Sequence, residues 1–383
     1  MSTNSMLPDA LVPLLPTTPV DVFLQHALTG QPVAWEDGLS VAEIMAVLQS
    51  HRLGPLLCAQ LLPETWATLP GELQTWLKAS ARGQVVLDLQ QTLALQELLP
   101  LAQARGIRVL LLKGVPVGYR YYAEPHHRVK TDVDLLVGPA DVSGLVALLE
   151  ALGYTRSVGI TGKLVNRQTT LARGDVALDV HWSAANTALF AHVLDFETMW
   201  RERLPISELG AAACAPADED LFLHACFHLA LHISYEFALV WLYDIHLMAT
   251  RWPPEALERC LLRARQLQIA RVCLACLALS RAWFGTPYAD DFCAELARQS
   301  ADEPSAQVLV RHLSRWQRFR LELQALSWGE RVRLLREMVL PPADYLRRRY
   351  SDTTTWLPWL HVKRWLGQPG KADVPSSGAE GQR

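Results

Sequence analysis

The chain has 383 residues, half of them hydrophobic and a fifth charged, which is typical of a globular protein with a substantial core in two or three domains. Its formal net charge is −3, so no overall field draws it to nucleic acid or to a membrane.

We expect neither a targeting signal nor a membrane-spanning segment in this sequence. The first 20 residues hold four prolines and no basic cluster, so we expect no signal peptide. No apolar run approaches the roughly 18 residues that cross a bilayer; the best candidate, Phe237 to Met248, is interrupted by Asp244 and His246. Seven cysteines without regular spacing indicate a reducing compartment. We therefore expect a cytoplasmic protein without stable membrane insertion.

The first part of the chain carries helical patterns. We expect a flexible N-terminus over residues 1–18, followed by helices only over 19–105. Residues 41–48 have helical periodicity, and residues 84–105 are rich in Leu, Gln and Ala, which are strong helix formers. Gly106 then ends this helix as a C-terminal capping glycine would.

Strand and helix patterns interleave only between residues 106 and 200, which we interpret as the catalytic core. Arg173-Gly174-Asp175 between two short strand patterns predicts a hairpin. The expected elements are strands over 107–112 and 131–137, helices over 115–122 and 141–152, and hairpin strands over 169–172 and 176–181. The expected fold class is therefore α+β, a small sheet embedded in a mainly α-helical chain.

Residues 201–366 return to a helical pattern, and we expect a disordered tail over 367–383. Asp218 is placed to cap the first of these helices. From Arg311 to Arg364 there are twelve Lys and Arg against five Asp and Glu, a net charge of +7. Two interpretations stay open: solvated helix faces with arginines along an apolar seam, or a surface for a phosphate-bearing partner such as RNA or a membrane.

Three aspartates form the candidate metal site. Asp132 and Asp134 are two residues apart, so on a strand both side chains point to the same face. Asp179 lies in a later strand pattern between Leu178 and Val180. Neighbouring carboxylates repel each other unless a cation lies between them, and Mg²⁺ or Mn²⁺ prefers such oxygen ligands. The alternative for the first pair is a solvated strand edge.

A Lys-Gly turn precedes these aspartates. Lys113 and Gly114 follow the first strand pattern and open the next helix. Gly114 allows close backbone approach to a phosphate, and Lys113 supplies a positive charge. Only six residues of the chain are lysines against thirty arginines, which favours a specific role for Lys113.

These motifs resemble the uncharacterised bacterial nucleotidyltransferase family of the DNA polymerase β superfamily and, more distantly, nucleotidyltransferase toxins of abortive-infection systems. The resemblance implies a mixed sheet with helices, a metal-bound NTP and nucleotidyl transfer. Many superfamily members carry Gly-Ser where this chain has Lys113-Gly114, so their chemistry transfers less directly. The residues that carry the resemblance are Leu112-Lys113-Gly114, Tyr121-Tyr122, Arg128, Asp132 to Val137 and Leu178 to Trp182, with weaker matches at His224, His228, Asp244 and 341–350.

The resemblance also implies roles. Asp132 and Asp134 would hold the metal ion that bridges the triphosphate, and Asp179 would help bind a second metal ion and orient or deprotonate the acceptor hydroxyl. Lys113 and the Gly114 amide would contact the β and γ phosphates.

Two further residues belong to the candidate nucleotide-binding set. Arg128 would bind phosphate or brace the strand of Asp132. His181 would approach the metal site or the acceptor, or instead hydrogen-bond to Asp179 and orient it.

Other histidines and cysteines have alternative interpretations. His224, His228 and His232 form one stripe of a helix, which permits a zinc site, a buried polar network with Asp220 or Asp244, or contact with substrate. Cys273 and Cys276 form a lone CxxC inside an apolar helical pattern, which favours buried helix residues over a redox or zinc pair.

We therefore predict an Mg²⁺-dependent (or Mn²⁺-dependent) nucleotidyltransferase that moves NMP from an NTP, with ATP expected, to a hydroxyl of a protein, a small molecule or RNA. A non-catalytic nucleotide-binding or partner-binding member is the alternative. A sugar-nucleotide glycosyltransferase fits less well, because about 105 mostly helical residues precede the first strand where its nucleotide-binding half would lie. The sequence gives no strong indication of DNA binding.

Overall fold

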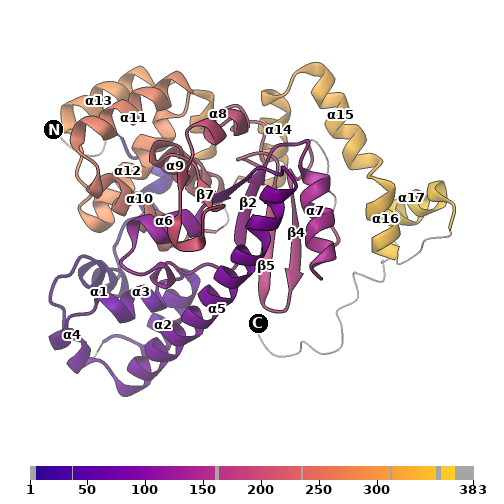
Figure 1. Ribbon diagram of the computed structural model, residues 1–383. Helices are drawn as coiled ribbons and strands as arrows, with labels where there is room; N and C mark the ends of the chain where they lie inside the picture. Colours follow the sequence, from indigo (N-terminus) through magenta and orange to yellow (C-terminus); the bar gives the residue numbers. More distant parts are fainter. Residues whose placement is uncertain are drawn as a thin grey trace.

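The computed structural model describes residues 6–36, 38–159, 164–233, 236–310, 313–350 and 355–366. Within these ranges it is an α+β structure with a small sheet surrounded by helices, as predicted (Figure 1). The tail predicted over 367–383 lies outside the described residues. Division of the chain into domains near residues 105 and 200 stays a prediction.

Helices form the N-terminal part, as expected. Thr18 begins the first of them with a capping box, because its hydroxyl accepts from the Asp21 amide and the Asp21 carboxylate accepts from the Thr18 amide. Part of the segment expected to be flexible is ordered: Asp9–Leu14 is a 3-10 helix whose Leu11 is buried. The helices are α1 (Pro19–Leu28), α2 (Val41–Ser50), α3 (Gly54–Gln60), α4 (Pro63–Thr68) and α5 (Gly71–Ala104).

Helix α5 links this part to the sheet. It is 34 residues long and ends where predicted, with Gly106 in the left-handed conformation at φ 71°. In Figure 1 it runs from the N-terminal helices to the sheet, where α7 (Val142–Ala151) also packs. Helix α5 thus covers part of one face of the sheet together with α7.

The sheet is mixed, as the family resemblance implied. Its order is β1-β2-β5-β4-β3, in which β2 and β5 are parallel and the other neighbouring pairs are antiparallel. The predicted hairpin is present as β4 and β5: β5 has the expected bounds, and β4 is one residue longer at each end than expected. The strands are β1 (Val109–Leu112), β2 (Val133–Val137), β3 (Thr155–Arg156), β4 (Gln168–Arg173) and β5 (Val176–His181).

Alternation along β2 separates two apolar layers. Val133, Leu135 and Val137 pack with α5 and α7, whereas Leu136 packs toward the C-terminal helices. Asp134 has the same parity as Leu136, so its carboxylate lies on the face that looks toward those helices. The side chains of β2 are therefore buried on both faces, and a buried carboxylate there needs a compensating partner.

The C-terminal part is helical, as expected. Asp218 does not cap the first helix as predicted: Ala217 is the capping residue, and the Asp218 carboxylate accepts from Arg120 (3.0 Å) instead. Cys273 and Cys276 are buried free thiols in one helix, which confirms the structural interpretation of that pair. No helix in the described ranges is both long and apolar enough to cross a membrane.

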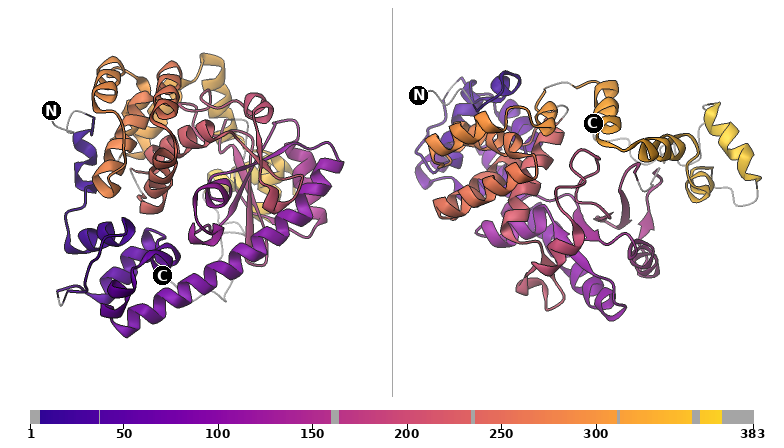
Figure 2. Two further views of the ribbon diagram at one scale, coloured as in Figure 1. Left: turned by 60° about the vertical axis from the view of Figure 1, so that its left-hand side comes forward. Right: turned by 90° about the horizontal axis from the view of Figure 1, so that it is seen from above.

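The remaining elements complete the chain order. Helices α14 to α17 form the gold to yellow part of the chain and lie at one side of the molecule in the right-hand view of Figure 2. The bounds are α6 (Gly114–Tyr121), α8 (Phe196–Arg201), β6 (Leu204–Pro205), β7 (Cys214–Ala215), α9 (Asp218–His232), α10 (Leu239–Arg251), α11 (Pro254–Gln266), α12 (Ala270–Phe284), α13 (Asp290–Gln299), α14 (Arg315–Ala325), α15 (Trp328–Val339), α16 (Ala343–Tyr350) and α17 (Leu357–Trp365), with 3-10 turns at Pro125–His127, Ser207–Leu209 and Pro304–Val308.

Candidate active site

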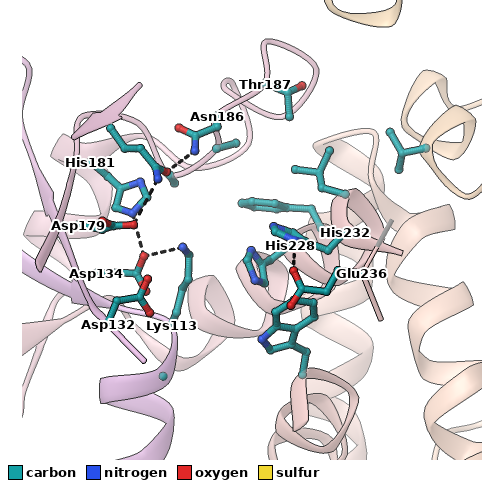
Figure 3. Close-up of a pocket in the computed structure, with 18 of the residues that line it drawn as sticks. Lys113, Asp132, Asp134, Asp179, His181, Asn186, Thr187, His228, His232 and Glu236 are labelled. Carbon is teal, nitrogen blue, oxygen red and sulfur yellow. Dashed lines mark hydrogen bonds and ion pairs between the residues drawn. The ribbon is translucent and has the colours of Figure 1, made fainter. Parts of the chain in front are cut away.

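Parallel pairing of β2 with β5 brings the aspartates together. Asp134 lies directly opposite Asp179 in the register, so both carboxylates project from the same face. Asp132 immediately precedes β2 and lines the same cavity (Figure 3). One ligand atom from each of Asp134, Asp179 and His181 lies within 4.8 Å of the others. The structure therefore places the predicted carboxylates at one site.

Lys113 faces these carboxylates from the turn between β1 and α6. Its backbone has φ 53° and ψ −120°, an uncommon conformation for a residue other than glycine. The side chain reaches Asp134, with 2.5 Å between Nζ and Oδ1. The strained turn thus directs the ammonium group toward the strand of aspartates, as Figure 3 shows.

Gly114 has a steric reason to be glycine. A Cβ at this position would lie 2.8 Å from Cγ of Lys130, closer than real contacts allow. Lys130 is itself buried and ion-paired with Asp88 of α5. The turn therefore packs directly on the segment that leads to Asp132, and phosphate contact by the Gly114 amide stays a prediction.

The charges of the site influence one another. Burial would raise the pKa of Asp134, but Lys113 and His181 hold it well below its usual range. Burial raises the pKa of Asp132, and the negative charges of Asp134 and Asp179 raise it further. Burial opposes the charge of Lys113, yet the carboxylates outweigh it and raise the pKa of the ammonium. Negative charge is thus in excess at this site.

Asp179 shows that the site fits a cation. Its Oδ2 accepts from Nε2 of Gln168 (3.2 Å), but its Oδ1 is buried without a hydrogen-bond partner among the described residues. An orphaned carboxylate oxygen next to two further carboxylates is unfavourable unless a cation is bound. Asp132, Asp134 and Asp179 are oxygen ligands of the kind that Mg²⁺ prefers.

His181 lies at the candidate metal site, the first of the two positions expected for it. Its Nε2 lies 2.8 Å from Oδ1 of Asp134, so the hydrogen bond goes to this aspartate and not, as the alternative had it, to Asp179. The register explains this difference: His181 pairs with Leu136, two residues beyond Asp134 and on the same face. His181 therefore positions Asp134, and Asp179 relies on Gln168, a residue that the sequence did not single out.

Arg128 forms a buried ion pair. Its Nη2 lies 2.7 Å from Oδ2 of Asp244, and both side chains are almost inaccessible. Tyr122 donates to Oδ1 of the same carboxylate (2.8 Å). This geometry supports the bracing role, because the pair ties the segment before Asp132 to α10. A direct contact with phosphate stays a prediction.

A cavity of about 540 Å³ opens in front of the aspartates. The opposite wall carries His228 and His232 of α9 and Trp241 of α10. Both imidazole rings lie edge-on to the indole, with 5.0 Å between the ring centroids in each case. Burial, with the charge of Lys113, depresses the pKa of His228 and lowers that of His232 to about 4. These two histidines are therefore neutral near pH 7.

His224, the third member of the stripe, has a structural role. Its Nε2 donates to the carbonyl of Ala184 (3.0 Å), and the residue is buried. Among the described residues, the cluster suited to a metal ion consists of Asp134, Asp179 and His181, which does not support a zinc site on α9.

Several cavity residues could not be identified from sequence. They come from distant segments and belong to no motif: Arg52, Asn186, Arg318 and Glu322. Only the fold brings them together, so no spacing in the sequence signals them.

A solved structure and a protein family are similar to this chain. The solution structure of the antibiotic-resistance factor ANT(2'')-Ia is similar at 17% sequence identity with a TM-score of 0.33, over 48% of this chain and 94% of that one. No curated protein matches the chain. A family model described as an uncharacterised nucleotidyltransferase matches residues 37–285, more than half of the chain. The chain therefore belongs to this uncharacterised nucleotidyltransferase family and is a nucleotidyltransferase, as its sequence motifs predicted.

Proposed function

We propose that this protein transfers NMP from an NTP, with ATP as the expected donor, to a hydroxyl group of an acceptor, and that Mg²⁺ or Mn²⁺ is required. The observation that carries the proposal is the meeting of Asp132, Asp134 and Asp179 beside Lys113, where one buried carboxylate oxygen has no hydrogen-bond partner in the part of the chain that the structure describes. Such a site suits a divalent cation and a phosphate chain together.

The side chains have distinct roles in this reaction. Asp132 and Asp134 would hold the metal ion, and Asp179 would help to hold a second one. Bound divalent metal would supply charge neutralisation on the triphosphate. Lys113, on the same edge of the cavity, would contact the β and γ phosphates, and His181 keeps Asp134 oriented.

The transfer forms one bond to the α-phosphorus and breaks another. The acceptor oxygen bonds to the α-phosphorus, the bond from the α-phosphorus to the bridging oxygen breaks, and pyrophosphate leaves. Asp179 would orient or deprotonate the acceptor hydroxyl, which its Oδ1, without a hydrogen-bond partner within the described structure, leaves it able to do.

Two buried ion pairs keep the loop before Asp132 in position. Arg128 pairs with Asp244 of α10, and Lys130 pairs with Asp88 of α5. Arg128 and Lys130 line the same cavity as the aspartates, and their ion pairs fix the segment that leads to Asp132. Misplacement of such groups by even an ångström lowers rates strongly.

The acceptor would occupy the part of the cavity near α9 and α10. This wall offers neutral imidazoles and an indole as well as the charged side chains of Arg52 and Glu322. Three classes of acceptor therefore stay open: a protein side chain, a metabolite and an RNA end.

The cytoplasm is the compartment that we propose, and the seven unpaired cysteines are in keeping with it.

The proposal is tested with each α-labelled NTP, Mg²⁺ or Mn²⁺, and cell extract as the source of acceptor. We expect label to move to protein, RNA or a metabolite only when the metal is present, and to be lost in Asp179→Asn. A matched control is Asp175→Asn in the β4–β5 hairpin loop, away from the cavity lining. Metal-dependent binding of NTP without transfer of label would instead favour the non-catalytic alternative.

A further inference from the structure

Helix α15 presents an apolar face that no other described part of the chain covers. Trp328, Val332, Leu335 and Val339 follow the spacing i, i+4, i+7 and i+11, so they form one stripe. Their side chains are 77%, 55%, 45% and 51% exposed. Four large apolar residues on one solvent-facing stripe are more than scattered surface positions.

The opposite face of α15 is already in contact with the protein. Leu334 is buried in a small cluster with Leu164 and Ala188, and the Glu337 carboxylate accepts from the backbone amides of Leu164 (2.9 Å) and Val165 (3.0 Å). The helix is therefore docked, and the exposed stripe is the face that points away from the body.

Basic residues flank the stripe. At about 100° per residue, Arg331 and Arg336 fall on either side of it. The surrounding segment from Arg311 to Arg364 carries a net charge of +7. Indole, aliphatic and guanidinium groups arranged in this way are characteristic of helices that lie in the interface of an anionic bilayer.

Neighbouring helices extend the same character. Trp365 of α17 donates to the carbonyl of Val339, so the end of α17 adjoins the end of the stripe. Trp365 and Leu366 are also exposed, as is Trp316 of α14. In the right-hand view of Figure 2, the gold and yellow helices extend from one side of the molecule.

We propose that α15, with the adjoining end of α17, docks on the surface of an anionic lipid membrane. A second copy of the chain fits less well, because two segments of charge +7 would face each other. RNA fits less well, because three of the four side chains of the stripe are aliphatic and offer no ring for a base to stack on. Residues 367–383 contain Val374 as their one large apolar side chain, too little to cover the stripe.

Helix α5 offers a matched control within the same chain. Val86, Leu89 and Leu93 form a stripe that is 57%, 58% and 57% exposed. This stripe has no tryptophan, and α5 carries two basic and three acidic residues, a net charge of −1. It therefore tests whether exposed apolar area alone is sufficient for lipid binding.

The experiment is flotation of the purified full-length protein with vesicles of phosphatidylcholine, with or without phosphatidylglycerol. We expect flotation only with phosphatidylglycerol and its loss at high salt. Val332→Ser/Leu335→Ser and Arg331→Glu/Arg336→Glu should each lower binding at least about tenfold. Val86→Ser/Leu89→Ser should bind as the parent does, and circular dichroism checks that every variant is folded.

Other results would overturn the proposal. They are absence of flotation, equal flotation with phosphatidylcholine alone, or equal loss in the α5 control. Sedimentation velocity identifies self-association as the true role if the parent is a dimer and Val332→Ser/Leu335→Ser is a monomer. Binding of an RNA oligonucleotide that the Arg331→Glu/Arg336→Glu variant loses, without any vesicle binding, would assign the surface to nucleic acid.

Discussion

Two buried pairs of an aspartate and a basic residue lie close together in this molecule and differ in their surroundings. Asp134 pairs with Lys113 at 2.5 Å, and Asp244 pairs with Arg128 at 2.7 Å. Both carboxylates are only 4% exposed. Yet Asp134 lines the large cavity beside two more carboxylates, whereas Asp244 is not part of its lining, and its ion pair lies between helix α10 and the loop before β2.

The difference lies in the balance of charge. Arg128 contacts both oxygens of Asp244 and Tyr122 donates to one of them, so that carboxylate is neutralised and hydrogen-bonded. At the other pair, Lys113 faces Asp134 together with Asp132 and Asp179. A neutralised pair holds the fold in register, whereas an excess of carboxylates prepares a site for a cation.

The largest effect that we expect is on activity, from Asp134→Asn. This change removes a proposed metal ligand and the partner of both Lys113 and His181. We expect turnover to fall about 10³-fold or more. Lys113 keeps Asp132 and Asp179 nearby, so the urea midpoint should move less than in a variant of the other pair. Unchanged turnover with labelled NTP would refute the assignment.

The next effect is on stability, from Asp244→Asn. This change leaves the buried Arg128 without a compensating charge, and breaking such a pair costs about 3–5 kcal/mol. Urea unfolding, followed by circular dichroism, measures the loss.

The matched control for that change is the double variant Arg128→Leu/Asp244→Leu. Replacing a buried ion pair by apolar side chains is often close to neutral, so we expect it to recover most of the lost stability. A double variant that is as unstable as the single one would show that the two side chains do not act as a pair.

Much of this arrangement was predictable from local patterns. Alternation along residues 131–137 and the Gly174-Asp175 turn predicted the strands, and the β-hairpin fixed Asp179 within a strand. The motif then identified the three aspartates. These features depend on residues that are close together in the sequence, so the sequence alone was sufficient to predict them.

Other features depend on contacts across the fold. Parallel register between β2 and β5 decides that His181 contacts Asp134 rather than Asp179, and sequence does not specify it. The partner of Arg128 lies 116 residues later, in α10. Asp218 was expected to cap α9, but pairing with Arg120 of α6 takes its carboxylate instead. Tertiary contacts of this kind override local signals.

Helix α9 adjoins residues of both pairs and gives the smallest expected effect. His224 and Lys113 line a small void together with Arg128 and Asp244. Burial, with the charge of Lys113, lowers the pKa of His224 from 6.5 to about 3. Below pH 6.5 the unfolded chain therefore binds a proton that the folded chain refuses until about pH 3.

Stability should consequently fall as pH decreases through this window, by at most about 1.4 kcal/mol per pH unit from His224. His224→Gln removes the titration while its amide can still donate to the Ala184 carbonyl, so the decline between pH 6 and pH 4 should become shallower. Urea midpoints for both proteins at several pH values measure this. Parallel curves would show that burial does not hold His224 neutral, because an imidazole that protonates freely would add no slope.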